Sequence, residues 1–197
     1  MTSSADAARQ ILDYWFGEIG PDRWWAGRSK AVDDTIRTRF LGLWEEWRGR
    51  PAEQFLATAE KALAAIIQFD QFSRNMFRGD ARAFATDALA LEIAIGAIDK
   101  GYEARMTPEE RSFLYMPFQH AEDLAMQDRA VTLFTALRFR DSAEFAKKHR
   151  EIIARASGAF RRATQRSAAK MHRVKPRPLP RPPAGSPASA NHVLLKK

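Results

Sequence analysis

The acidic residues of this chain all lie before Arg155, and the sequence beyond that point has a different character. Residues 1–155 hold all 24 acidic residues and 22 of the 32 lysines and arginines, a formal net charge of −2. The remaining 42 residues carry ten positive charges, no negative charge and six of the ten prolines. Such a segment has too few apolar residues to offset the entropy lost on ordering. We therefore expect one folded domain over 1–155 and a disordered, basic, proline-rich tail over 156–197.

The composition of the body limits its class and its location. A length of about 150 residues suits a single domain with a proper hydrophobic core. No stretch approaches the roughly 18 to 20 uninterrupted apolar residues of a membrane span, and the start, MTSSADAARQ, lacks the apolar core of a signal peptide. We expect a cytoplasmic protein with no membrane partner. The absence of cysteine excludes disulfides, thiolate metal sites and cysteine nucleophiles.

Apolar residues recur every three or four positions along the body, which predicts an all-α fold. Gly101 favours a left-handed helix end, and Thr107, Pro108 and Glu110 form a capping-box start. Pro117 is expected to interrupt the next helix, so that a separate one follows it. The expected helices cover about residues 4–16, 30–48, 52–75, 82–100, 108–116 and 117–138, with a last one capped by Asp141. Antiparallel helix pairs joined by short turns are the expected architecture.

Three of the expected helices carry polar residues on their apolar faces. These residues are Asp70 and Arg74 in 52–75, Asp87 in 82–100, and His120 and Gln127 in 117–138. One interpretation is a structural staple in which Arg74 is satisfied by two buried aspartates, since an unpaired buried ion costs several kcal/mol. The other is a ligand or catalytic pocket, lined by Asp70, Arg74, Asn75 and His120. Polar groups that converge in an apolar cleft are how such sites are built.

His120 is expected in the first turn of the helix that follows Pro117. The helix dipole there disfavours the imidazolium, whereas Glu122 and Asp123 favour it, so the sequence does not fix its protonation state. The four histidines include no pair at i, i+4 spacing, and neither a serine elbow nor a glycine-rich phosphate loop is present. We predict no metal site and no bound cofactor. Arg78 is either an anion contact or a solvated surface arginine.

Three runs of sequence carry a resemblance to a known family. They are ILDYWFGE from Ile11, LAAIIQFDQFSRNMFRGDARAFATDALAL from Leu63 and FLYMPFQHAEDLAMQ from Phe113. Over about 11–155 the chain resembles the bacterial domain of unknown function 924 family, whose motifs have the forms DQFxRNxxRG and YxPxxHxEDxxxQ. The resemblance implies a helical fold similar to tetratricopeptide-repeat proteins and no established activity. Its motif positions here are Asp70, Gln71, Arg74, Asn75, Arg78, Asp87, Pro117, His120, Glu122 and Gln127.

The family pattern continues with the form FGRFPxRNxxLGR, from which this chain departs at Ala156. It reads ASGAFRRATQRSAAK instead. When degenerate codons for these residues are read from the third base of each codon into the next, they can encode Phe, Gly, Arg, Phe and Pro in the family order. We interpret residues 156–197 as the product of a frameshift; the alternative is a genuine basic tail. A frameshift would deprive the predicted pocket of two or three arginines, an asparagine and aromatic rings.

Three functional classes follow from these residues and from the resemblance. The first is binding of a small anionic molecule or peptide in a polar pocket between helices, because such helical folds make concave surfaces. The predicted ligand-binding residues are Asp70, Gln71, Arg74, Asn75, Arg78, Asp87, His120 and Gln127. The alternative is an enzyme that uses His120 as general acid or base, with Asp70 or Glu122 as the orienting carboxylate. The third is weak, non-specific nucleic-acid binding through the tail; neither a specific nucleic acid nor an oligomeric state is predicted.

Overall fold

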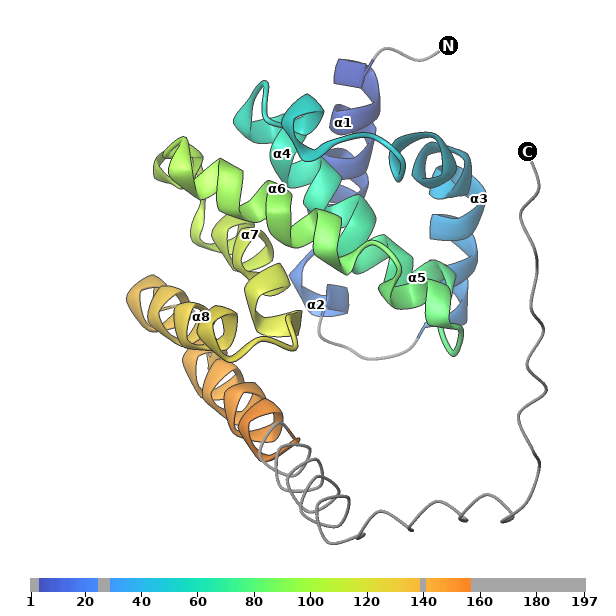
Figure 1. Cartoon of the computed structure of the whole chain (residues 1–197). Helices are drawn as coiled ribbons and strands as arrows, with labels where there is room; N and C mark the ends of the chain where they lie inside the picture. The colour runs from blue at the N-terminus through green and yellow to red at the C-terminus, as the bar shows by residue number, and fades with distance from the viewer. Residues whose placement is uncertain (1–3, 25–28, 139–140, 157–197) are drawn as a thin grey trace, which may run out of the picture. The chain divides into compact units, whose positions relative to one another are not determined.

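The computed structural model describes residues 4–24, 29–138 and 141–156, and these ranges are helical without any β-strand (Figure 1). The α-helices are α1 (Ser4–Leu12), α2 (Pro21–Trp24), α3 (Lys30–Trp47), α4 (Ala59–Ile66), α5 (Ser73–Met76), α6 (Asp87–Asp99), α7 (Pro108–His120) and α8 (Leu124–Leu137). The π-helices are η1 (Asp13–Ile19) and η3 (Ile67–Phe72), and the 3-10 turns are η2 (Ala52–Phe55), η4 (Ala81–Phe84) and η5 (Tyr102–Arg105). Residues 142–156 form a further helix. The prediction of an all-α fold is confirmed.

The predictions for the tail, its disorder and its origin in a frameshift, fall on residues 157–197, outside the described part of the chain. They stay predictions. Within the described ranges, no helix combines the length and the apolar character needed to cross a membrane.

Local capping residues set the starts of the helices that hold the site. The Ser29 hydroxyl accepts a hydrogen bond from the Val32 N–H at the start of α3, and Thr58 caps α4 in the same way. The predicted capping box of α7 is present. The Thr107 hydroxyl accepts from the Glu110 N–H, and the Glu110 carboxylate accepts from the Thr107 N–H. These helix starts are therefore fixed locally, before any tertiary contact is made.

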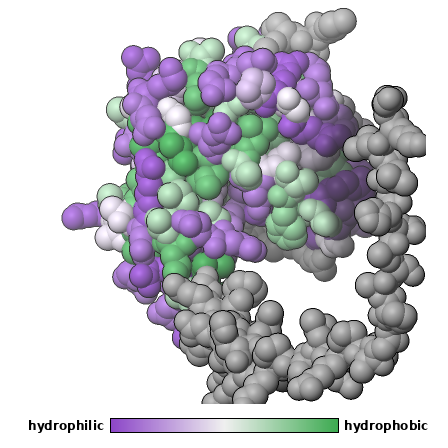
Figure 2. Space-filling model, in the orientation of Figure 1, coloured by the Kyte–Doolittle hydropathy of each residue, from purple (hydrophilic) through white to green (hydrophobic). Residues whose placement is uncertain are grey.

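Helix α4 lies at the centre of the helical body, in contact with α1, α6 and α7 (Figure 1). Its residues from Ala62 to Ile66 are all fully buried, because apolar side chains cover every side of the helix after its first turn. Helix α3 packs along η3 and α5, where the rings of Phe40 and Phe72 lie 4.7 Å apart. On the face shown in Figure 2, apolar and polar side chains are intermixed. The buried α4 gives η3 and α5 a rigid base.

The π-helix η3 continues α4 and is held by buried hydroxyl groups. Turns of this kind are rare and are frequently found at functional sites. The carbonyl oxygen of Phe69 accepts a hydrogen bond from Thr86 Oγ1 at 2.7 Å, and that of Gln68 accepts one from Ser73 Oγ at 3.3 Å. Trp44 Nε1 of α3 donates to the same Ser73 hydroxyl at 2.9 Å. The wider turn rotates the side chains that follow it, so η3 sets their direction.

The structure corrects three predicted helix boundaries. The helix expected over 82–100 begins only at Asp87, because the 3-10 turn η4 occupies Ala81–Phe84. The helix expected over 52–75 begins only at Ala59, because Pro51 precedes the short turn η2 and Thr58 then caps α4. Pro117 lies inside α7 instead of separating two helices. Residues 112–119 are all buried, and this packing offsets the hydrogen bond that a proline cannot donate. Gly101 does adopt the predicted left-handed conformation, with φ 69°.

His120 is consequently the last residue of α7, whereas the sequence had placed it in the first turn of a helix. The effect of the helix dipole at this position is therefore opposite to the predicted one, because the C-terminal end of a helix favours positive charge. The next residue, Ala121, is the C-cap of α7 and has an extended backbone with ψ 137°. Asp123 then begins α8, its carboxylate accepting hydrogen bonds from the N–H groups of Ala125 and Met126.

Candidate functional site

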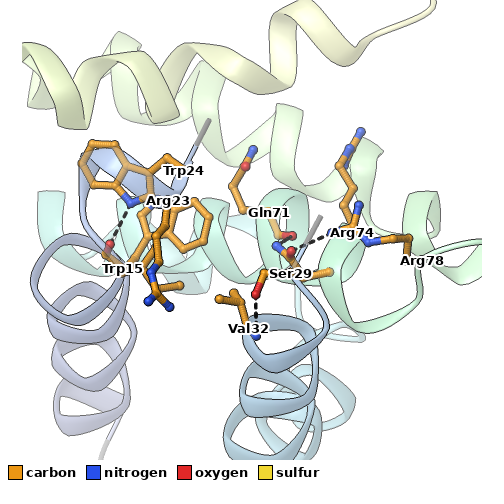
Figure 3. A pocket seen from close by; sticks show the side chains of 10 residues that line it. Trp15, Arg23, Trp24, Ser29, Val32, Gln71, Arg74 and Arg78 are labelled. Atoms are coloured by element: carbon orange, nitrogen blue, oxygen red, sulfur yellow. Dashed lines mark hydrogen bonds between the residues drawn. The ribbon is translucent and has the colours of Figure 1, made fainter. Parts of the chain in front are cut away.

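An open cavity of about 270 Å³ lies between η1 and α2 on one side and the start of α3 with η3 and α5 on the other (Figure 3). Its walls are formed by Trp15, Ile19, Arg23, Trp24, Ser29, Val32, Gln71, Arg74, Asn75 and Arg78. Four of the predicted ligand-binding residues share one wall, namely Gln71, Arg74, Asn75 and Arg78. They do so because Gln71 lies three and four residues before the adjacent Arg74 and Asn75, and Arg78 lies four and three residues after them, from η3 to the turn after α5.

The wall formed by η1 and α2 is mainly apolar. Trp15 and Ile19 lie four residues apart on η1, which brings both side chains to the cavity. The ring of Trp24 stacks on that of Trp15 with centroids 6.3 Å apart and an angle of 20°, and Trp24 Nε1 donates to the Trp15 carbonyl oxygen at 2.8 Å. Trp15 is 4% exposed, and its own Nε1 has no hydrogen-bond partner among the described residues. A buried donor in this state is unusual.

Arg74 joins two aspartates and also lines the cavity. Its guanidinium forms a fork with the Asp87 carboxylate, at 2.8 and 2.9 Å, and its Nη1 lies 3.1 Å from Asp70 Oδ1. Nη1 also donates to the Asp70 carbonyl oxygen at 2.8 Å. The two ion pairs of the staple interpretation are thus present, but only Asp70 is fully buried, since the Asp87 side chain is 27% exposed. The Arg74 side chain remains 22% exposed, so Arg74 both pairs with the aspartates and forms part of the cavity wall.

Arg78 is tied to the start of α3. Its Nε and Nη2 donate to the two carboxylate oxygens of Asp33 at 2.9 and 3.0 Å, and Nη2 also donates to Asn75 Oδ1 at 2.9 Å. Asn75 Nδ2 in turn donates to the Gln71 carbonyl oxygen at 2.9 Å. Arg78 is exposed at the surface, yet Asp33 and Asn75 hold its guanidinium in place, so both alternatives for this residue stay open. One edge of its guanidinium is bound by Asp33, and Arg78 also forms part of the cavity wall.

Among the described residues that form the walls of this cavity, arginine is the only charged residue type. Neither Nη1 of Arg78 nor Nε of Arg74 donates to any residue in the described ranges, so both retain free N–H groups. Arg23 is exposed, and no carboxylate of the described residues pairs with it. The cavity therefore presents hydrogen-bond donors, while the aspartates that pair with the arginines do not line it.

Asp70 is fully buried next to this wall and contacts His120. His120 Nδ1 lies 2.7 Å from Asp70 Oδ1, and Gln71 Nε2 donates to Asp70 Oδ2 at 2.5 Å. Burial alone would raise the pKa of Asp70, but His120, with help from Arg74 and Gln71, holds it below its ordinary value. Above its ordinary pKa the carboxylate therefore stabilises the fold. That stability is lost as the pH falls through the lower, folded value.

His120 lies outside the walls of the cavity and faces a second histidine. Its ring centroid is 6.5 Å from that of His149, which comes from the helix over 142–156. Burial lowers the pKa of His149, and the positive charge of His120 lowers it further. The Asp70–His120 pair is therefore adjacent to the cavity through Asp70, Gln71 and Arg74, but it is a separate group of side chains.

The remaining predicted residues have other positions. Gln127 is buried, and its Nε2 donates to the carbonyl oxygens of Gln119 and Ala121, each at 2.6 Å, which fastens the corner between α7 and α8. Glu122 is exposed, so Asp70 is the carboxylate that orients His120. Sequence reasoning missed Arg23 and Ser29 altogether. Trp15 had appeared only within the run ILDYWFGE of the family resemblance.

A larger cavity, of about 530 Å³, lies between α1 and the start of α4. Its charged wall residues, Arg9, Asp13, Glu60 and Lys61, balance one another, and most of the remaining wall is alanine, leucine and threonine. It contains none of the predicted site residues. The smaller cavity is the better candidate because its charges have one sign and its polar groups converge.

The fold and the site define an all-α protein whose helices enclose an arginine-lined cavity beside a buried aspartate–histidine pair. The sequence matches the bacterial proteins of unknown function DUF924 over residues 11–169, and the chain belongs to this family. The match runs past Arg155, where the resemblance was expected to end. A solved structure of a protein of unknown function from Agrobacterium tumefaciens is similar, with 37% identity and a TM-score of 0.74, covering 79% of this chain and 86% of that one. A comparison with curated proteins gives no significant match.

Proposed function

We propose that the protein binds a small anionic molecule in the cavity between η1, α2, α3 and α5. The observation that carries this proposal is that, among the described residues, three arginines and no acidic residue line the cavity. Guanidinium groups form strong, directed hydrogen bonds with carboxylate and phosphate oxygens. Arg74 and Arg78 are already oriented by aspartates, so a ligand would not have to order them.

The size of the cavity favours a small molecule over a peptide. Ligand pockets usually enclose about 300–1,000 Å³, and this cavity, at about 270 Å³, is slightly smaller than the lower end of that range. Both kinds of ligand were expected from the sequence. A peptide would need a longer groove, whereas a compact anion can reach the arginines and the tryptophans together.

Arg23→Ala should weaken the binding of small anions to the full chain by roughly 10- to 100-fold, because a charged hydrogen bond contributes about 1.5–3 kcal/mol. Isothermal titration with a panel of carboxylates and phosphate esters measures the effect. Arg9→Ala is the matched control. It removes the same charge, but from an exposed side chain of α1 that lines the other cavity. Equal losses in the two variants would show non-specific attraction, and a panel without any binder would contradict the proposal.

A second candidate function is acid–base catalysis by His120. It is favoured by the 2.7 Å contact between His120 Nδ1 and the buried Asp70, which would leave Nε2 to move a proton. Turnover of a panel of esters and phosphate esters should then be lost in His120→Gln. It should fall by about 10²- to 10⁴-fold in Asp70→Asn, which removes the orienting charge. Full activity in His120→Gln, or no turnover of any substrate by the wild type, would remove this candidate.

A further inference from the structure

We propose that the ligand of this cavity is a monocarboxylate with a small aromatic body. Its carboxylate would lie against Arg74 and Arg78, and its ring would lie against Trp24. The inference rests on the proposed function, since it names the class of anion that the same cavity takes. Figure 3 shows the basis for it: Trp15, Trp24 and Arg23 lie across the cavity from Arg74 and Arg78. Apart from Arg23, the side formed by η1 and α2 is apolar, so a matching ligand has one polar and one apolar end.

The charges around the cavity favour a single negative charge on the ligand. Arg78 is matched by Asp33, whereas Arg74 stands between two aspartates. His120 Nδ1 also lies 2.7 Å from Asp70, so among the described residues Arg23 is left without a carboxylate partner. One ligand charge can be met by Arg23 and by the positive end of the α3 dipole, which is worth about half a charge. A phosphate monoester brings two charges, and the second would face the aspartates without a cation of its own.

The free donors suit the oxygens of a carboxylate. Nη1 of Arg78 has two N–H groups without partners among the described residues, and Nε of Arg74 has one. The hydroxyl of Ser29 accepts from the Val32 N–H and can still donate its own proton. Two carboxylate oxygens, with about four acceptor positions between them, match this number of donors.

The apolar side favours an aromatic ring at one place. The rings of Trp15 and Trp24 are 6.3 Å apart, which is too close for a third ring between them, since each pair of stacked rings needs about 3.5 Å. Trp24 also makes T-shaped contacts with Phe16 and Phe113, but it is only half-buried and lines the cavity, so its exposed part is the surface on which a ligand ring can stack. Ile19 and Val32 add apolar contacts at the edges of the same space. The volume corresponds to about nine water molecules, enough for a ligand of roughly ten heavy atoms.

The test is isothermal titration of the full chain with five probes: benzoate, cyclohexanecarboxylate, acetate, benzyl alcohol and phenyl phosphate. Benzoate should bind about 10-fold more tightly than acetate, which lacks the ring, and than benzyl alcohol, which lacks the charge. It should also bind more tightly than cyclohexanecarboxylate and phenyl phosphate. Trp24→Leu should remove the preference for benzoate over acetate. If that variant loses its helical signal, the comparison of benzoate with cyclohexanecarboxylate on the wild type measures the same aromatic preference.

The outcomes separate this inference from the proposed function. Tighter binding of phenyl phosphate than of benzoate, or equal binding of benzoate and cyclohexanecarboxylate, overturns the aromatic monocarboxylate while anion binding stands. An absence of binding by every anion overturns both. Binding of benzoate that Arg9→Ala weakens and Arg23→Ala does not would place the ligand in the other cavity, and would likewise overturn the inference.

Discussion

Arg74→Ala should lower the free energy of unfolding by about 3–5 kcal/mol, because it leaves the charge of Asp70 buried without its arginine. The Asp70 side chain is 1% exposed, so water cannot replace the guanidinium. Asp87 loses both of its hydrogen bonds from Arg74 at the same time. Urea unfolding followed by the helical circular dichroism signal measures the loss.

Arg82→Ala is the matched control for this prediction. Arg82 also forms an ion pair with an aspartate, Asp80, but its side chain is 60% exposed. Exposed pairs of this kind contribute about 0–1 kcal/mol, so the control should lose less than about 1 kcal/mol. If Arg74→Ala lost as little as Arg82→Ala with its helical signal intact, Asp70 would be reached by water. The ion pairs of Arg74 would then not stabilise the fold, and the role of Arg74 would be limited to the cavity wall.

Much of the fold follows from the sequence because its signals are local. The capping box at Thr107 and the glycine end at Gly101 act within one helical turn and were predicted correctly. The position of Pro117 inside α7 was not, because the burial of residues 112–119 is a tertiary effect that outweighs a local rule. The π-helices were missed for a related reason. Their wider turns are held by contacts such as that of Thr86 with the Phe69 carbonyl, 17 residues away along the chain.

The candidate site likewise has features that follow from local sequence and others that depend on tertiary packing. The apolar stripe that runs into Asp70 and Arg74 is visible in the sequence because both residues lie on one helical face. Spacing alone cannot show that His120, fifty residues later, contacts Asp70. Nor can it show that Arg23 and Ser29 complete the cavity, because they lie in segments whose pattern indicates only helix and turn. The sequence predicted the burial of Asp70 and Gln127 but not that of Gln68, Ser73 and Thr86. The packing of α3, α5 and α7 decides which polar residues meet.

Trp44→Ala should cost about 3–5 kcal/mol, because Trp44 is 2% exposed and its removal leaves a large cavity between α3, α5 and α6. Part of this loss should come from one hydrogen bond. Trp44 Nε1 donates to Ser73 Oγ, which bonds the Gln68 carbonyl and lies 3.0 Å from Thr86 Oγ1. Urea unfolding of both Trp44→Ala and Trp44→Phe separates the lost volume from the lost donor.

Trp44→Phe keeps most of the ring and removes only the indole N–H, so it should cost about 1–3 kcal/mol. A loss of that size would show that α3 stabilises η3 through the buried hydroxyl cluster, because the indole N–H holds the Ser73 hydroxyl that donates to the Gln68 carbonyl. If Trp44→Phe were as stable as the wild type, the π-helix would rest on Ser73 and Thr86 alone. The position of Gln71 and Arg74 in the cavity would then depend on α6 and not on α3, since Thr86 immediately precedes α6.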